Sequence, residues 1–340
     1  MATTIKDVAA LAGVSPSTVS RVCNDHPSIS RETRERVRSA MAQLGYEPNT
    51  SAPQTRERMR MVGVILPPSP WETFENTFHL EVIRGISQVC NQRQVACTVV
   101  TGQDDNEVLQ AVQSLAQNGQ MDGFILLYSK KDDIVMDYLC EQGLLYVLIG
   151  KAEQPTGQTI CIDNDNLVAG REATEYLYKL GHRRIGYLGS QSVFVFSAER
   201  KSGYQLALLQ HGLPVRPEYC VEMEGFRFDA ADDLISLLLR PDRPTALVVS
   251  DDILAVGLEH TCTGLGLRIP EDISIISFNN SIMAQLSHPQ LTSVDVNSFQ
   301  LGFEAASQIL NHADNPNLMA AKMIVPHHIV ERASCAKAEA

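Results

Sequence analysis

Short apolar runs alternate with amphipathic stretches along most of the chain beyond residue 60. Runs of this kind are typical of buried strands in parallel sheets, and the stretches between them have the periodicity of crossover helices. We therefore predict strands at 61–66, 96–100, 123–127, 145–149, 184–189, 220–223, 246–250 and 273–278. The helices predicted between them cover 80–92, 106–118, 134–142, 165–180, 198–210, 230–239 and 253–264.

The alternation restarts near residue 165, which predicts two lobes, each a doubly wound α/β sheet with helices on both faces. Sheets of this kind bind ligands beyond the carboxyl ends of their strands. Two facing lobes therefore predict a ligand cleft between them.

The first 48 residues have a different pattern, with short helices and no strand. Thr4 followed by Asp7 is a helix-capping signal, and Gly13 ends the helix that they begin. Ser15 then caps a second helix, with Pro16 in its first position, where the missing N–H costs nothing.

A third helix is predicted from Arg31 to Leu44, capped by Ser30. Two short helices joined by a glycine turn form a helix-turn-helix, in which the second helix enters the major groove of DNA. On that helix, small hydroxyl side chains permit close approach to the bases, and Arg21 suits the O6 and N7 atoms of guanine. The first 48 residues are therefore predicted to form an all-α DNA-binding head.

The charge distribution supports this division of the chain. The 340 residues carry 28 Lys and Arg against 40 Asp and Glu, a formal net charge of -12, which by itself argues against a nucleic-acid partner. The first sixty residues, however, hold nine basic and six acidic side chains and are +3, whereas the other 280 residues carry -15. A basic end on an acidic body is typical of a nucleic-acid module joined to a larger globular domain.

The head also has a family resemblance. Ile5-Lys-Asp-Val-Ala-Ala-Leu-Ala-Gly-Val-Ser-Pro-Ser-Thr-Val-Ser-Arg-Val, Thr33-Arg-Glu-Arg-Val and Leu44-Gly-Tyr-Glu-Pro-Asn closely resemble the head of the lactose-repressor (LacI) family of bacterial transcription regulators, over nearly all of residues 3–49. The resemblance implies a homodimer that reads a palindromic double-stranded DNA operator. The candidate DNA-binding residues that it implies are Thr4, Ser15, Pro16, Ser17, Thr18, Arg21, Asn24, Tyr46 and Asn49.

The segment 49–61 departs from the family pattern. Thr55 stands where the resemblance implies a leucine that wedges into the minor groove, and Pro53 falls inside the implied hinge helix. Either a shorter helix begins near Pro53, with a methionine at 59 or 61 as its apolar element, or no minor-groove helix forms. Arg56, Arg58 and Arg60 either hold phosphates or belong to an ordinary charged linker.

The body is similar to the periplasmic-binding-protein-like effector domain of the same family. The similarity rests on Ile162-Asp-Asn-Asp-Asn, Leu180-Gly-His-Arg-Arg-Ile-Gly-Tyr-Leu-Gly, Glu199-Arg-Lys-Ser-Gly-Tyr, Pro270-Glu-Asp-Ile-Ser-Ile-Ile-Ser-Phe-Asn-Asn and Leu291-Thr-Ser-Val. It implies three crossings between the lobes, placed near residues 160, 290 and 322. The expected domains are 1–48, a linker 49–61, and an effector domain 62–340 with lobe 1 at 62–160 and 291–322 and lobe 2 at 161–290 and 323–332.

The same resemblance implies an effector site in the cleft. Arg200 matches an arginine that holds effector hydroxyls or carboxylates, and Asp251 either binds the ligand, caps the next helix, or does both. Asn279 stands where many sugar-responsive members have Asp, a change that still suits a neutral polyol. The remaining candidates are Lys151, which is otherwise a surface charge, and the aromatic residues Trp71, Phe78, Phe194 and Phe196, which either stack on a sugar or pack in the core.

The Phe278-Asn-Asn segment with Leu291-Thr-Ser-Val is similar to the maltose-responsive branch of the family. A maltose-type glucoside is therefore the expected effector. An α/β enzyme and a sugar-binding protein without a DNA role are the competing hypotheses. The sequence has no glycine-rich nucleotide loop, serine-nucleophile elbow or zinc-protease motif, so we expect neither catalysis nor a cofactor.

The remaining features concern metals, cysteines and location. His327-His328 is either a weak metal pair or part of a solvated tail, and we expect no metal site. Eight scattered cysteines are typical of reduced thiols. No apolar run reaches the length of a membrane helix and the N-terminus lacks the features of a signal peptide, so the expected location is cytoplasmic, with no membrane partner.

Overall fold

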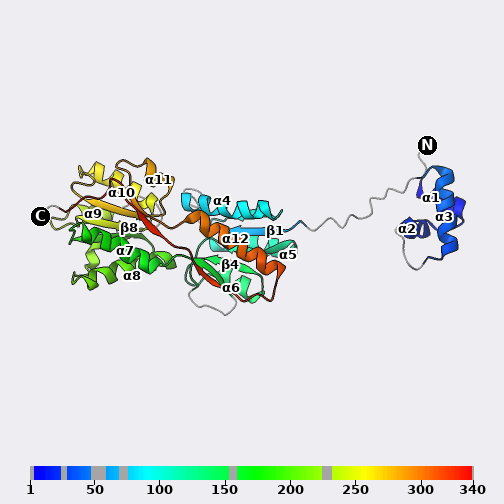
Figure 1. Cartoon of the computed structure of the whole chain (residues 1–340), viewed down its shortest axis with the longest axis horizontal. Helices are drawn as coiled ribbons and strands as arrows, with labels where there is room; N and C mark the ends of the chain where they lie inside the picture. The colour runs from blue at the N-terminus through cyan, green and yellow to red at the C-terminus, as the bar shows by residue number, and fades with distance from the viewer. Residues whose placement is uncertain are drawn as a thin grey trace. The chain divides into compact units, whose positions relative to one another are not determined.

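The computed structural model describes residues 4–23, 29–46, 59–68, 76–152, 159–223 and 232–338. The chain divides into two compact units, Met1–Met59 and Arg60–Ala340 (Figure 1). This boundary falls inside the segment 49–61 that the sequence analysis treats as a linker.

The first unit is the small helical head. Its helices are α1 (Ile5–Ala12), α2 (Pro16–Cys23) and α3 (Arg31–Leu44), as predicted. The Asp7 carboxylate accepts hydrogen bonds from the Thr4 N–H at 2.8 Å and the Thr4 hydroxyl at 2.7 Å, which lowers the pKa of Asp7. Gly13 ends α1 at φ 65°, a left-handed conformation that costs glycine little. The core comprises Val8, Ala9, Ala12, Val19, Val22, Val37, Ala40 and Met41.

The second unit contains the two predicted lobes. The first lobe is built on a parallel sheet with the strand order β11-β5-β4-β3-β1-β2. Its strands are β1 (Met61–Ile65), β2 (Ala96–Val100), β3 (Met121–Leu126), β4 (Tyr146–Ile149), β5 (Ile160–Asp163) and β11 (Lys322–Ile324). Helices α4 (Thr77–Gln92) and α12 (Ser298–Asp314) pack on one face, and α5 (Asp105–Gln117) and α6 (Ile134–Glu141) on the other.

The second lobe repeats this plan with the strand order β12-β10-β9-β8-β6-β7, in which only β12 is antiparallel to its neighbour. Its strands are β6 (Ile185–Ser190), β7 (Cys220–Met223), β8 (Ala246–Val249), β9 (Ser274–Phe278), β10 (Thr292–Asp295) and β12 (His328–Val330). Helices α7 (Asn166–Lys179) and α8 (Val195–Gln210) cover one face. Helices α9 (Asp232–Leu238), α10 (Asp252–Gly264) and α11 (Ile282–Leu286) cover the other, and a short 3-10 turn, η1 (Pro217–Tyr219), precedes β7.

Every strand and helix predicted up to residue 278 is present, with ends that differ by at most three residues. The three crossings lie slightly later than the predicted 160, 290 and 322. Residues 160–163 and 322–324 pair within the first sheet, and 292–295 pair within the second. The displacement arises because the short strands β5, β10 and β11 were not predicted, and each continues its sheet a few residues past the predicted crossing.

A buried amide ties the three crossings together. Asn164, just after β5, donates through Nδ2 to the carbonyl oxygen of Val296 at 3.0 Å and to that of Val325 at 2.9 Å. Val296 follows β10 and Val325 follows β11, so each crossing supplies one of the three residues. Asn164 is 4% exposed, and a buried polar group is costly unless it is hydrogen-bonded. These bonds therefore fix the crossings as one hinge.

Each lobe holds one helix pair at very close range. A Cβ on Gly302 of α12 would overlap the carbonyl oxygen of Val82 in α4, and one on Gly203 of α8 would overlap that of Leu167 in α7. Glycine is therefore required for these helices to touch backbone to backbone, which makes each pair a rigid unit. Among the described residues, no helix is both long and apolar enough to cross a membrane.

We predict that Gly302→Ala lowers the free energy of unfolding by about 3 kcal/mol, because the added methyl meets backbone that cannot move aside. Gly264→Ala is the matched control, since that helical glycine has no neighbour within 4 Å among the described residues. It should stabilise the protein by roughly 0.5–1 kcal/mol. Urea unfolding checks both, and equal midpoints for the two variants would refute the close-packing account.

Candidate functional site

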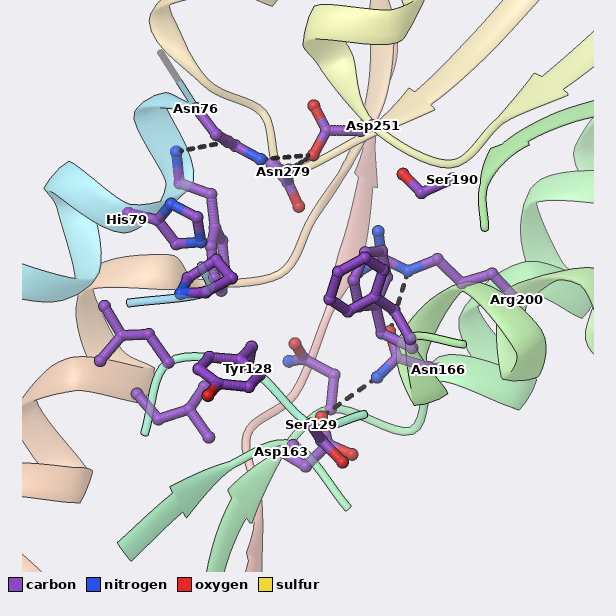
Figure 2. A pocket seen from close by; sticks show the side chains of 18 of the residues that line it. Asn76, His79, Tyr128, Ser129, Asp163, Asn166, Ser190, Arg200, Asp251 and Asn279 are labelled. Carbon is purple, nitrogen blue, oxygen red and sulfur yellow. Dashed lines mark hydrogen bonds between the residues drawn. The ribbon is translucent and has the colours of Figure 1, made fainter. Parts of the chain in front are cut away.

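A cavity of about 180 Å³ opens between the lobes, at the carboxyl ends of the strands (Figure 2). It has room for on the order of a dozen water molecules, which matches a small organic ligand better than a single ion. Its walls include the residues that follow β1, β3, β4 and β5 of the first lobe, and β6, β8 and β9 of the second. This is the position that the parallel-sheet rule predicts for a ligand.

Arg200 of α8 forms the centre of the second-lobe wall. Its Nε donates to Asn166 Oδ1 at 2.9 Å and its Nη1 donates to the Ser250 carbonyl at 2.6 Å. The guanidinium carbon lies 4.3 Å from the centre of the Phe278 ring and 5.1 Å from that of Phe196. Burial lowers the pKa of Arg200. These contacts hold the guanidinium rigidly, and Nη2 has no hydrogen-bond partner within the described segments.

Asp251 connects the two lobes at the opposite edge of the cavity. Its Oδ2 accepts from Asn279 Nδ2 at 2.8 Å and, across the cleft, from Asn76 Nδ2 at 3.1 Å. Its Oδ1 accepts from the Ile253 N–H at 2.9 Å, so Asp251 also caps α10. Figure 2 shows the three side chains facing one another. Burial raises the pKa of Asp251 to about 6, a shift that nearby Asp252 reinforces.

The floor of the cavity carries Asp163, at the end of β5. Asn166 Nδ2 donates to Asp163 Oδ1 at 3.1 Å, so Asn166 links this carboxylate to Arg200. Burial raises the pKa of Asp163 from 3.8 to about 7. Beside it, Lys151 of the first lobe pairs with Glu199 of the second at 2.5 Å, a second contact across the cleft.

A backbone bridge closes one side of the cleft. Lys130 and Phe194 form an isolated antiparallel bridge, flanked by bonds from Lys131 N to Val193 O at 3.2 Å and from Val195 N to Ser129 O at 3.1 Å. Phe194 and Phe196 lie with ring centres 6.0 Å apart and line the cavity, as Phe78 does from the first lobe.

The structure thus brings seven of the eight predicted effector residues to one cavity, namely Phe78, Lys151, Phe194, Phe196, Arg200, Asp251 and Asn279. Trp71 lies outside the described residues. The sequence analysis missed Asn76, His79, Tyr128, Ser129, Asp163, Asn166 and Ser190. Their position as polar residues after a strand was the signal that could have identified them. Asp163 and Asn166 also belong to the Ile162-Asp-Asn-Asp-Asn segment, which was already quoted for the family resemblance.

In the head, four of the nine predicted DNA-binding residues, Ser15, Pro16, Ser17 and Thr18, lie at the start of α2. Ser15 and Pro16 are exposed there, and Ser15 Oγ accepts from the Thr18 N–H at 3.2 Å, so Ser15 caps the helix. Exposed Thr4 caps α1, and Tyr46 packs against the head core after α3. Ser17 and Arg21 belong to α2, but their side chains, like Asn24 and Asn49 as a whole, lie outside the description.

Two further predictions change in the structure. Arg60 is not part of a free linker, because it pairs with Asp122 and Asp314 of the effector domain, each at 2.8 Å. His327 is not in a solvated tail, because its Nε2 lies 3.1 Å from Glu172 Oε2 and its side chain is 9% exposed. The described residues hold no cluster suited to a metal ion. Pro53 and Thr55 lie outside the described ranges.

Comparison with known proteins finds the same two parts. Residues 4–49 match the family described as bacterial regulatory proteins, lacI family, and residues 174–335 match a periplasmic binding protein-like domain. The HTH-type transcriptional regulator MalR of Streptococcus pneumoniae serotype 4 is 32% identical over 342 residues, which cover 98% of this chain and 100% of the relative.

Two solved structures are also similar. A complex of the transcriptional regulator CelR with cellobiose superposes with a TM-score of 0.75 at 27% identity, over 98% of this chain and 100% of that one. A protein described as probable maltose operon transcriptional repressor malR, from Staphylococcus aureus, gives a TM-score of 0.73 at 26% identity, over 81% of this chain and 97% of that one. These relatives are transcription regulators, not enzymes.

We predict that Asp163→Asn stabilises the protein at pH 7.5 by on the order of 1 kcal/mol or more. The folded state raises the pKa of Asp163 to about 7, so it holds this proton more tightly than the unfolded chain, and the free energy of unfolding falls as the pH rises from about 4 to about 7. Asparagine keeps the acceptor for Asn166 but carries no charge.

Urea unfolding at pH 4.5 and 7.5 measures this effect. Asp165→Asn, an exposed cap two residues away, controls for the loss of one negative charge. A stability gain for Asp163→Asn that is the same at both pH values would contradict the prediction.

Proposed function

The chain belongs to the lacI family of bacterial regulatory proteins, and we propose that it is a repressor that binds a palindromic operator as a homodimer. A neutral sugar bound in the cleft changes its affinity for that operator. The observation that carries the ligand part is the cavity in which Arg200 of one wall faces the Asn76–Asp251 contact between the lobes. The helix-turn-helix head carries the DNA part.

The charges of the cavity favour a neutral ligand. Lys151 is already paired with Glu199, and the buried guanidinium of Arg200 stands against two carboxylates of the lining, Asp163 and Asp251. A phosphate or carboxylate ligand would add negative charge beside these acids, and an unpaired buried charge is costly. A neutral sugar avoids that cost.

The remaining lining groups suit the two faces of a sugar. Asn76, Asn166, Asn279 and Ser190 can donate and accept hydrogen bonds, as hydroxyl groups require. Phe78, Phe194 and Phe196 offer apolar ring faces for the C–H side of a pyranose. The maltose type is supported by the relatives, of which one is described as a maltose operon repressor and one is bound to cellobiose, also a disaccharide of glucose.

The switch follows from contacts that exist only when the lobes are close together. Asn76 with Asp251, Lys151 with Glu199 and the bridge between Lys130 and Phe194 all join one lobe to the other. A ligand that touches both walls favours the arrangement in which these contacts form, and only such differential binding can shift the equilibrium. A sugar-binding protein without a DNA role is disfavoured because residues 4–49 would then have no use.

We predict that Arg200→Ala weakens maltose binding at least tenfold and leaves operator affinity without sugar unchanged. The variant removes a charged donor, whose hydrogen bonds are worth about 1.5–3 kcal/mol. Isothermal titration with maltose measures this, and Arg183→Ala, a surface arginine stacked on Tyr178, is the matched control. A wild-type isotherm from Arg200→Ala would exclude the cavity as the sugar site.

We predict that Arg21→Ala abolishes sequence-specific operator binding, while maltose binding persists. The loss of one bidentate base contact costs about 1–3 kcal/mol of discrimination. Gel-shift titration against the operator and a scrambled duplex measures it. Arg31→Ala, a 93%-exposed side chain on α3, is the control. Undiminished operator preference in Arg21→Ala would show that the base-reading helix is assigned wrongly.

A further inference from the structure

The effector domain begins with two ion pairs made by Arg60, with Asp122 and with Asp314, which we call the clamp. Arg60, the first residue of this domain, pairs through Nε with Asp122 Oδ2 at 2.8 Å and through Nη1 with Asp314 Oδ1 at 2.8 Å. The Arg60 carbonyl also accepts from the Ala96 N–H at 2.9 Å. The chain that leads back to the head is therefore fastened to β2, to β3 and to the last residue of α12. Arg93 approaches the other oxygen of Asp314, at 3.5 Å, and holds the carboxylate in place.

The other end of α12 lies at the cleft. Leu301, in its first turn, is 2% exposed and lines the cavity. Just before the helix, Asn297 donates through Nδ2 to the Pro326 carbonyl at 2.7 Å, and Val296 accepts from the hinge residue Asn164. From residue 301 to residue 314 the helix rises about 20 Å. One straight element thus connects the ligand wall and the hinge to the clamp.

Helix α12 does not move alone. It lies alongside α4 (Figure 1), and the two backbones touch at Gly85 and Gly302, where any Cβ would overlap the partner helix. The start of α4 carries Asn76, which contacts Asp251 across the cleft, and Phe78 in the cavity wall. A change at the cleft therefore displaces α4 and α12 together, because close-packed backbone transmits strain instead of absorbing it.

We propose that α12 and the Arg60–Asp314 pair transmit the state of the cleft to the chain that leads to the DNA-binding head. Asp314 is a positioning residue, since it acts through Arg60 and does not line the cavity. This inference rests on the proposed function, in which a ligand of the cleft alters operator affinity. Breaking the clamp should leave both binding reactions intact and remove only the coupling between them.

The test measures operator affinity by fluorescence anisotropy, with a duplex selected from a random pool by the wild-type protein, in the absence and presence of saturating maltose. Coupling in allosteric proteins is typically 5–150-fold. We expect at least a fivefold change for the wild type and less than twofold for Asp314→Asn, with the Kd for maltose within twofold of wild type by titration calorimetry. Arg60→Gln breaks the same pair from its other side and should show the same loss.

Glu304→Gln is the matched control, because it neutralises a carboxylate on the same helix that accepts a hydrogen bond from Gln300 at 2.7 Å and not from Arg60. It should keep the wild-type coupling. Wild-type coupling in Asp314→Asn, or equal loss in Glu304→Gln, would overturn the proposal.

A second experiment uses no ligand, so its result does not depend on which sugar is the effector. Failure of maltose to change wild-type operator affinity would count against the proposed effector, not against the clamp. Asn76→Ala removes the contact with Asp251 across the cleft, and we expect it to change operator affinity at least threefold with the clamp intact. When Asn76→Ala is combined with Asp314→Asn, operator affinity should be the same as that of Asp314→Asn alone. An equal change in both backgrounds, or none in either, would contradict transmission through α12.

Discussion

The two hydrogen bonds of Asn164 are the constraint on which the effector domain depends. A single buried amide holds the three crossing segments within bonding distance of one point. The lobes can therefore change their mutual arrangement only about that point, since translation apart would leave a buried donor and two carbonyl groups without partners. The glycine contacts between α4 and α12, and between α7 and α8, make each lobe stiff enough to move as a body. Two stiff bodies on one hinge can rotate about it, and the proposed switch uses this rotation.

The polar contacts across the cleft are few, and Phe78 of the first lobe also packs against the apolar core of the second. One amide–carboxylate bond, one half-exposed ion pair and one backbone bridge join the lobes in the described residues that line the opening. Exposed ion pairs contribute little, about 0–1 kcal/mol. The energy difference between lobe arrangements is accordingly within the range that a small ligand can overcome. The apolar cores lie inside each lobe, and Phe78 packs against one core in each of them.

Local signals explain what the sequence could predict. The head helices begin at capping residues, and α1 and α3 end at Gly13 and Gly45. Strands β1 to β4 and β6 to β9 are equally visible as apolar runs, whereas β5, which begins at the predicted crossing near residue 160, was not predicted. Arg200, Asp251 and Asn279 follow from the family resemblance, which fixes positions without geometry.

The rest depends on tertiary contacts that no local pattern encodes. Neither helix α12 nor the clamp was predicted. In the sequence, Arg60 looks like one more charge of the linker, and its pairing with Asp122 and Asp314 becomes visible only in the folded structure. Asn76 and Asn166 reach the site beside Asp251 and Arg200, which lie 175 and 34 residues away along the chain. The structure of the complex with maltose is the most direct test of the whole account. The account predicts sugar density in contact with Arg200 of one lobe and Asn76 of the other, with both bonds of Asn164 intact. A sugar bound to one lobe alone or outside the cleft, or a hinge with those bonds broken, would contradict it.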